Sequence, residues 1–150
     1  MDMLFDPAGS ARTIERIQSL TPDSERHWGK LDAPGMLAHC RLAVETALDE
    51  RVQKQKLVGK LVAWMIKGKL LNSDEPFSRN SPTDPKMLEA NPKDLEQEKT
   101  ALVEAVKAFS ARGPSGMPAG AHPFFGKMTP EQWNRLMSKH IDHHLRQFGA

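Results

Sequence analysis

Six histidines are the residues of this 150-residue sequence best suited to chemistry, and three of them fall close together near its end. His140 and His144 are four positions apart, and His140 and His143 are three positions apart. On an α-helix both separations place two side chains on one face, with their Cβ atoms about 5–6 Å apart. Neutral imidazole is the commonest protein ligand for metal ions and binds zinc, nickel, copper and iron. Either histidine pair therefore offers two ligands to one divalent ion.

Two ligands from one helix rarely make a metal site, so a third must come from another part of the chain. His39 is the candidate, because helical spacing places it on the same side as Met36 and Ala43, which should face the core. A buried histidine needs a partner, since an unsatisfied buried polar group costs about 1–3 kcal/mol. That partner is either a metal ion shared by the three rings or a hydrogen bond within the core. Three histidine ligands would leave a coordination position open, which is typical of a catalytic site.

The other polar residues offer weaker chemistry, and none is assigned a catalytic role. Cys40 is the only cysteine, which excludes an intramolecular disulfide and a Cys-rich zinc site. It is expected to be a small core residue. The alternative is that Cys40 is a nucleophile with a histidine as its base. Asp142 is expected on the solvated face of its helix, and Gln147 is expected to hydrogen-bond a ligand ring or a bound group. The absence of a His-Glu-x-x-His motif argues against a zincin-type peptidase.

The elements that position these residues are predicted to be helices. Apolar residues repeat with the 3.6-residue period of an amphipathic helix, and no segment shows the alternation of a strand. The clearest helix start has Thr129 as the N-cap, Pro130 in the first turn and Gln132 at the capping-box position. The predicted helices are a short one at about 7–20 and four longer ones at about 33–52, 57–71, 93–111 and 130–148.

Two segments rich in proline and glycine, 72–92 and 113–126, are predicted to be long loops. They could shape an entrance to the histidine site. In the second loop, His122 and the pair Phe124-Phe125 either line that entrance or pin the loop to the helices. Together these elements predict an all-α fold, a four-helix bundle with a short additional N-terminal helix, in a single domain over residues 1–150.

The composition is that of an ordinary globular protein, with 39% hydrophobic and 27% charged residues and a formal net charge of +2. This balance argues against a dedicated nucleic-acid-binding protein. No signal-peptide or membrane-spanning pattern is present, so a cytoplasmic location without membrane association is expected. The segment 51–71 carries six cations and no acid. Its lysines either lie along the borders of an apolar helix face that packs in the bundle, or they bind an anionic partner. In the second case the protein would be a binding module.

Two segments resemble the DinB/YfiT-like superfamily: Met-Leu-Ala-His at 36–39 and His-Ile-Asp-His-His-Leu-Arg-Gln at 140–147. The run His-Pro-Phe-Phe-Gly at 122–126 and the C-terminal segment are similar to a bacterial DinB-like branch that is a domain of unknown function. The resemblance covers the chain from Trp28 to its end. It implies a four-helix bundle with a divalent metal ion at one end. We expect this ion to be nickel or zinc, because the ligands would all be nitrogens. The ligands that it implies are His39, His140 and His144. The sequence has His-Leu-Arg-Gln where the commoner motif is His-Arg-Gly-Gln, and His143 either replaces or assists His144.

The resemblance also implies classes of activity. Superfamily members include thiol-dependent S-transferases and isomerases that use bacillithiol, mycothiol or glutathione. We therefore expect a metal-dependent transferase or hydrolase in which a small thiol or water attacks a small electrophile, whose identity the sequence does not give. The alternative is a non-catalytic helical bundle stabilised by its metal ion. A homodimer is compatible with the resemblance, although no residue demands one.

Overall fold

The computed structural model describes residues 1–48, 68, 71, 73, 75–79, 92, 94–117, 121–122 and 125–150. These residues form helices α1 (Pro7–Gln18), α2 (Ala33–Leu48), α5 (Leu95–Gly116) and α6 (Pro130–Arg146), and a hairpin of β1 (Ala121–His122) and β2 (Gly126–Lys127). The described part of the chain is therefore mostly helical, with almost no strand, and the all-α prediction is confirmed.

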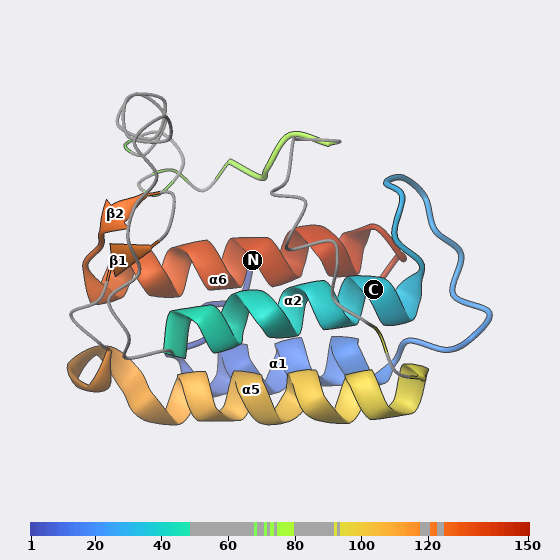
Figure 1. The fold of residues 1–150 in the computed structure, drawn as a ribbon, viewed down its shortest axis with the longest axis horizontal. Helices are drawn as coiled ribbons and strands as arrows, with labels where there is room; N and C mark the ends of the chain where they lie inside the picture. The colour runs from blue at the N-terminus through green and yellow to red at the C-terminus, as the bar shows by residue number, and fades with distance from the viewer. Residues whose placement is uncertain are drawn as a thin grey trace.

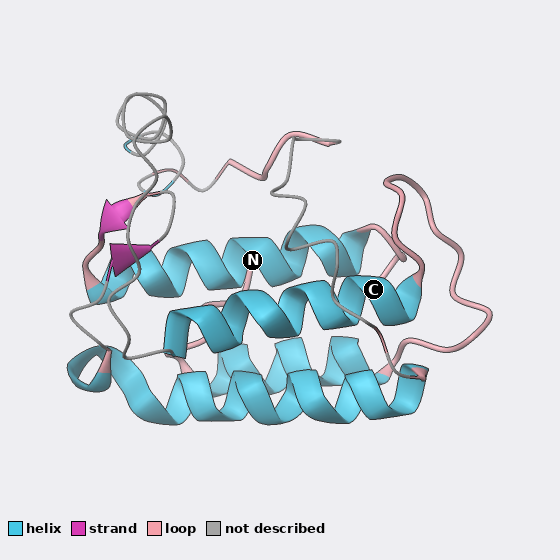
Figure 2. Ribbon diagram, in the orientation of Figure 1, coloured by secondary structure: helices cyan, strands magenta, loops and turns pink. Residues whose placement is uncertain are grey.

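The four described helices lie side by side, and the hairpin sits at one end of them (Figures 1 and 2). Helix α2 packs against both α5 and α6, and α1 packs against the same two helices. Their apolar faces meet in one core, in which Phe109 stacks on Phe5 with ring centroids 5.1 Å apart. Burying a side chain of this size contributes about 1.5–3 kcal/mol. No helix among the described residues is long and apolar enough to cross a membrane.

Short polar side chains fix where the helices begin. The Asp6 carboxylate accepts hydrogen bonds from the backbone N–H groups of Ala8 and Gly9 at the start of α1. At the start of α6, Thr129 and Gln132 form the predicted capping box in full. Such side chains satisfy N–H groups that have no partner within the helix. The predicted starts are therefore confirmed at these helices.

The structure differs from the predicted segment 113–126 in two ways, and three predictions lie almost wholly outside the described residues. Helix α5 continues to Gly116, so the loop expected from 113 begins later. The helix is kinked at Gly113, whose φ of +59° is one that a residue with a side chain rarely adopts. Within that loop the chain forms β1 and β2, which are too short for a sequence pattern to reveal. The helix predicted at 57–71, the loop at 72–92 and the basic segment 51–71 lie almost wholly outside the described residues.

Candidate metal centre

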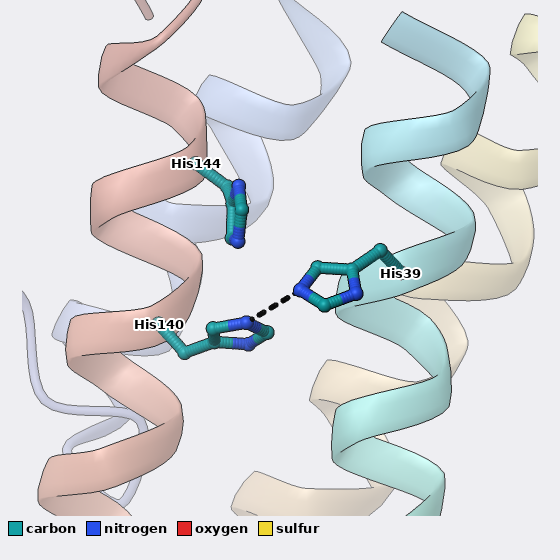
Figure 3. Close-up of side chains that lie close together, drawn as sticks. All are labelled: His39, His140 and His144. Carbon is teal, nitrogen blue, oxygen red and sulfur yellow. Dashed lines mark hydrogen bonds between the residues drawn. The ribbon is translucent and has the colours of Figure 1, made fainter. Parts of the chain in front are cut away.

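Three histidine rings from two helices point toward one another (Figure 3). His39 comes from α2, and His140 and His144 come from α6. The Nε2 atoms of His39 and His140 are 2.9 Å apart, and one nitrogen of each ring lies within 4.8 Å of the others. The structure thus brings together the three predicted ligands, which we call the histidine cluster.

The start of α2 sets the position of His39. The Asp32 carboxylate accepts a hydrogen bond of 2.8 Å from the backbone N–H of Gly35, which fixes the first turn. One turn further, His39 lies among residues that face the core and is only 3% exposed. On α6, the four-residue spacing puts His140 and His144 on the side that faces α2 (Figure 3). The geometry of the cluster therefore follows from helix periodicity on two helices that pack together.

Gln147 orients one ring of the cluster. Its side-chain oxygen lies 2.7 Å from Nδ1 of His144. Because an amide oxygen only accepts hydrogen bonds, Nδ1 carries the proton and Nε2 keeps its lone pair. Gln147 is held by the connector before α2: its carbonyl accepts the N–H of His27, and its amide lies against Gly29. Gly29 has a φ of +86°, and a Cβ there would lie 2.5 Å from Nε2 of Gln147. The predicted contact between Gln147 and a histidine ring is therefore confirmed.

Burial keeps two rings of the cluster neutral. It lowers the pKa of His140 well below its usual value, and neighbouring His144 and His39 lower it further. Burial also lowers the pKa of His144 to about 3, an effect that His39 reinforces and the hydrogen bond to Gln147 opposes. Both imidazoles are thus neutral near pH 7. The neutral ring is the form that binds metal ions.

The donor set fits a divalent cation. Two nitrogens bound to one zinc ion at about 2.0–2.1 Å can be at most about 4.2 Å apart. The 2.9 Å between the Nε2 atoms of His39 and His140 satisfies this limit, and His144 offers a nitrogen within 4.8 Å of one nitrogen of each of the other rings. Nδ1 of His140 is buried and has no hydrogen-bond partner among the described residues. Hydrogen bonding within the described part of the chain therefore does not fully satisfy this ring.

The other two histidines named by the sequence lie elsewhere. The His143 ring packs against Trp28 and Phe77, with centroids 6.1 and 5.9 Å away, and is not one of the three grouped rings. Nδ1 of His122 accepts the backbone N–H of Phe125, and its ring lies against Trp133. His122 thus pins the hairpin to α6, as one of the two interpretations expected.

Cys40 is buried, and this burial raises the pKa of its thiol. Its Sγ lies 3.9 Å from the sulfur of Met36 on the preceding turn. Only the thiolate is a strong nucleophile, and burial in apolar surroundings disfavours it. The structure therefore supports the core interpretation of Cys40 rather than the nucleophilic one.

The prediction that Asp142 is solvated is wrong. Its side chain is buried, and the carboxylate accepts from Arg16 at 2.8 Å and from Arg146 at 2.9 Å. Helix α1 packs on that side of α6 and brings Arg16 to it. The sequence shows the i,i+4 partner Arg146 but contains no signal for a partner more than a hundred positions away.

Sequence analysis also missed an aromatic group beside the histidine cluster. Trp28 has the guanidinium of Arg79 over its ring at 4.1 Å and the ring of His143 at its edge. His143 links this group to the cluster, because its ring centroid is 5.2 Å from that of His144. Trp28 and Arg79 lie in irregular segments, where no periodicity predicts which side chains meet.

The fold and the site together define a class: an all-α protein whose described helices bring three histidines into one candidate metal centre. The chain belongs to the family described as Protein of unknown function (DUF1569), whose family model matches residues 2–150. No curated protein and no solved structure matches the chain. The family match confirms that this is a domain of unknown function. The relation to the wider DinB/YfiT-like superfamily stays a prediction.

Proposed function

We propose that this protein is a DinB-like four-helix bundle that binds one divalent metal ion, nickel or zinc, through His39, His140 and His144. The observation that carries this proposal is the approach of the two Nε2 atoms to 2.9 Å between helices, with a nitrogen of the third ring within 4.8 Å. Two facing imidazole nitrogens need a shared proton or a shared cation between them. The hydrogen bond from Nδ1 of His144 to Gln147 leaves a lone pair on Nε2 of His144. This lone pair favours a cation, because a proton shared between His39 and His140 would not bind a third nitrogen, whereas a metal ion can bind all three.

An open coordination position is what connects this site with catalysis. Three protein ligands leave room for a water or a substrate atom. A divalent ion bound there would supply Lewis acidity, which lowers the pKa of a bound water toward about 7 or holds a thiol as its thiolate. Because Cys40, the only cysteine of the sequence, is buried, an attacking thiol would come from outside the protein. We infer a metal-dependent S-transferase or hydrolase that uses a small thiol or water against a small electrophile.

Described residues beside the cluster hold its geometry in place. Gln147 keeps the proton of His144 on Nδ1, and the connector through Gly29 holds Gln147 in place. Asp142, the carboxylate between the two α6 histidines in sequence, is paired with two arginines. It is therefore not offered to a substrate as a general base.

A second candidate is a non-catalytic bundle in which the ion only satisfies buried histidines. The burial of His39 favours it, because closed sites are typical of structural metal ions. The two candidates differ in what a chelator does. A structural ion contributes folding free energy, so its removal would strongly lower the melting temperature. A catalytic ion would leave the helices folded, while metal-dependent turnover with bacillithiol, mycothiol, glutathione or water would be lost.

Elemental analysis of untagged protein tests the metal proposal. Wild type should contain one equivalent of nickel or zinc after loading and desalting, and His140→Ala should contain almost none. His27→Ala, a substitution at an exposed histidine, is the matched control and should load like wild type. Equal metal content in wild type and His140→Ala would refute the proposed ligand set.

A further inference from the structure

A pocket of about 490 Å³ lies beside α6, where the N-terminal segment and Pro76 approach the helix. Pockets that hold small molecules occupy about 300–1,000 Å³, so this one has the volume of a ligand site. Among the described residues, His143 belongs to its lining, whereas His140 and His144 do not. The pocket therefore comes close to the histidine cluster without including its rings.

His143 lies between this pocket and the histidine cluster. Its half-buried side chain lines the pocket. Its ring centroid is also 5.2 Å from that of His144, and the two ring planes stand at 83°. One imidazole thus borders both a space of ligand size and the grouped nitrogens of the candidate metal centre.

Two aromatic side chains from irregular segments hold the ring of His143 in this position. Trp28 precedes α2, and its ring centroid is 6.1 Å from that of His143. The centroid of Phe77 is 5.9 Å from the same ring. The guanidinium of Arg79 lies over the Trp28 ring at 4.1 Å, which ties the segment of Phe77 to the segment of Trp28. These contacts keep the ring of His143 beside His144.

The ring of His143 is held differently from that of His144. Nδ1 of His144 is hydrogen-bonded to Gln147 at 2.7 Å, and such a bond fixes the direction of the ring. Among the described residues, His143 is held by ring contacts alone. A half-buried ring of this kind changes rotamer without breaking a hydrogen bond. Rotation of His143 away from His144 would join the pocket to the cluster.

We infer that His143 is a gate. Its ring separates the pocket from the histidine cluster in the arrangement described, and its rotation admits a small molecule from the pocket to the cluster. Side chains and loops that open in this way admit a substrate and otherwise exclude water from a reactive site. The use of this route by the small electrophile or thiol rests on the proposed function, whereas the gate itself needs no metal ion.

Modification of histidines by diethyl pyrocarbonate in metal-free protein tests this gate. The reagent is a small electrophile that reacts with neutral imidazole, so the rate at His144, followed by site-resolved mass spectrometry, measures access to the cluster. His143→Ala should raise this rate about tenfold, because it removes the ring together with its aromatic contacts. His143→Phe keeps a ring that packs against Trp28 and Phe77 and should show a rate close to that of wild type.

Two other histidines serve as internal controls. His27 is exposed, so its modification rate should be equal in all proteins. His122 lies in the hairpin at one end of the helices, and its rate should not rise unless the whole fold loosens (Figure 1).

Three results would overturn the inference: equal rates at His144 in wild type and His143→Ala, a His143→Phe protein as fast as His143→Ala, or a rise at His122 as large as at His144. None of them depends on metal content, so the gate and the metal proposal can fail separately.

Discussion

Helix α2 meets two neighbours through buried polar groups, and the two interfaces differ in how these groups are satisfied. Toward α5, the fully buried Glu98 accepts a hydrogen bond of 3.0 Å from Arg41, which also pairs with Glu45. Toward α6, His39 faces His140 at 2.9 Å, while Nδ1 of His140 lacks a partner among the described residues. The first interface is completed by opposite charges within the protein. The second brings together nitrogens of three rings, two of which burial keeps neutral, and a cation could bridge them. The first therefore serves stability, and the second is suited to a ligand.

The largest expected effect belongs to the charged interface. Arg41→Met should leave the Glu98 carboxylate buried without this partner. Removing one partner of a buried ion pair costs about 3–5 kcal/mol, and the partial exposure of Arg41 reduces this to about 2–4 kcal/mol. Urea unfolding of wild type and variant measures the loss. Lys107→Met, which breaks an exposed pair on α5, should cost less than about 1 kcal/mol. Equal losses in the two variants would contradict the contrast between the interfaces.

The histidine interface should respond to a metal ion instead. Nickel or zinc at 100 times its dissociation constant should raise the free energy of unfolding of wild type by about 2.7 kcal/mol. The same addition should leave His39→Ala and His140→Ala unchanged, and Arg41→Met should still gain the full increment. Thermal melts with and without metal provide the measurement. A gain in His140→Ala as large as in wild type would show that the ion binds elsewhere.

Gln147 should tune the metal site without being a ligand. Gln147→Met removes the acceptor for Nδ1 of His144 at nearly constant volume and should weaken metal affinity about 10–100-fold. Gln147→Glu keeps an acceptor oxygen and should restore most of the affinity. Competition with a chromogenic chelator gives the dissociation constants. A Gln147→Glu protein as weak as Gln147→Met would assign the effect to packing rather than to the hydrogen bond.

The metal-free protein should lose stability as the pH falls. The pKa values of His140 and His144 are lower in the folded state than the unfolded value of about 6.5, so the unfolded state takes up protons first. The free energy of unfolding should therefore decrease below about pH 6.5, by about 1–2 kcal/mol for each ring between pH 7 and pH 5. Urea titrations in chelator across this range measure the slope. The slope should shrink in His144→Ala and persist in His27→Ala, and an unchanged slope in His144→Ala would contradict the burial effect.

The sequence predicted those parts of the structure that depend on neighbours along the chain. The capping box of Thr129 and Gln132 and the shared helix face of His140 and His144 follow from spacings of three and four residues. The approach of His39 to His140 could be anticipated because both lie on faces expected to point into the core. The sequence alone could not choose between His143 and His144, since both spacings fit a helix. Packing of α2 against α6 favours His144.

The features that sequence analysis missed depend on contacts between distant segments. The burial of Asp142 requires Arg16 from α1, and the surroundings of His143 require Trp28 and Phe77 from irregular segments. Neither type of contact leaves a periodic pattern. Such contacts become visible only when the helices are placed against one another.

The most direct test of the central claim is a crystal structure of the zinc-loaded protein, with anomalous diffraction data collected at the zinc absorption edge. The account predicts one anomalous peak between α2 and α6, about 2.0–2.1 Å from one ring nitrogen each of His39, His140 and His144. For His144 that nitrogen should be Nε2, because Gln147 occupies the Nδ1 side. A peak coordinated by His143 in place of His144, or no peak at the histidine cluster in protein shown to be loaded, would contradict it.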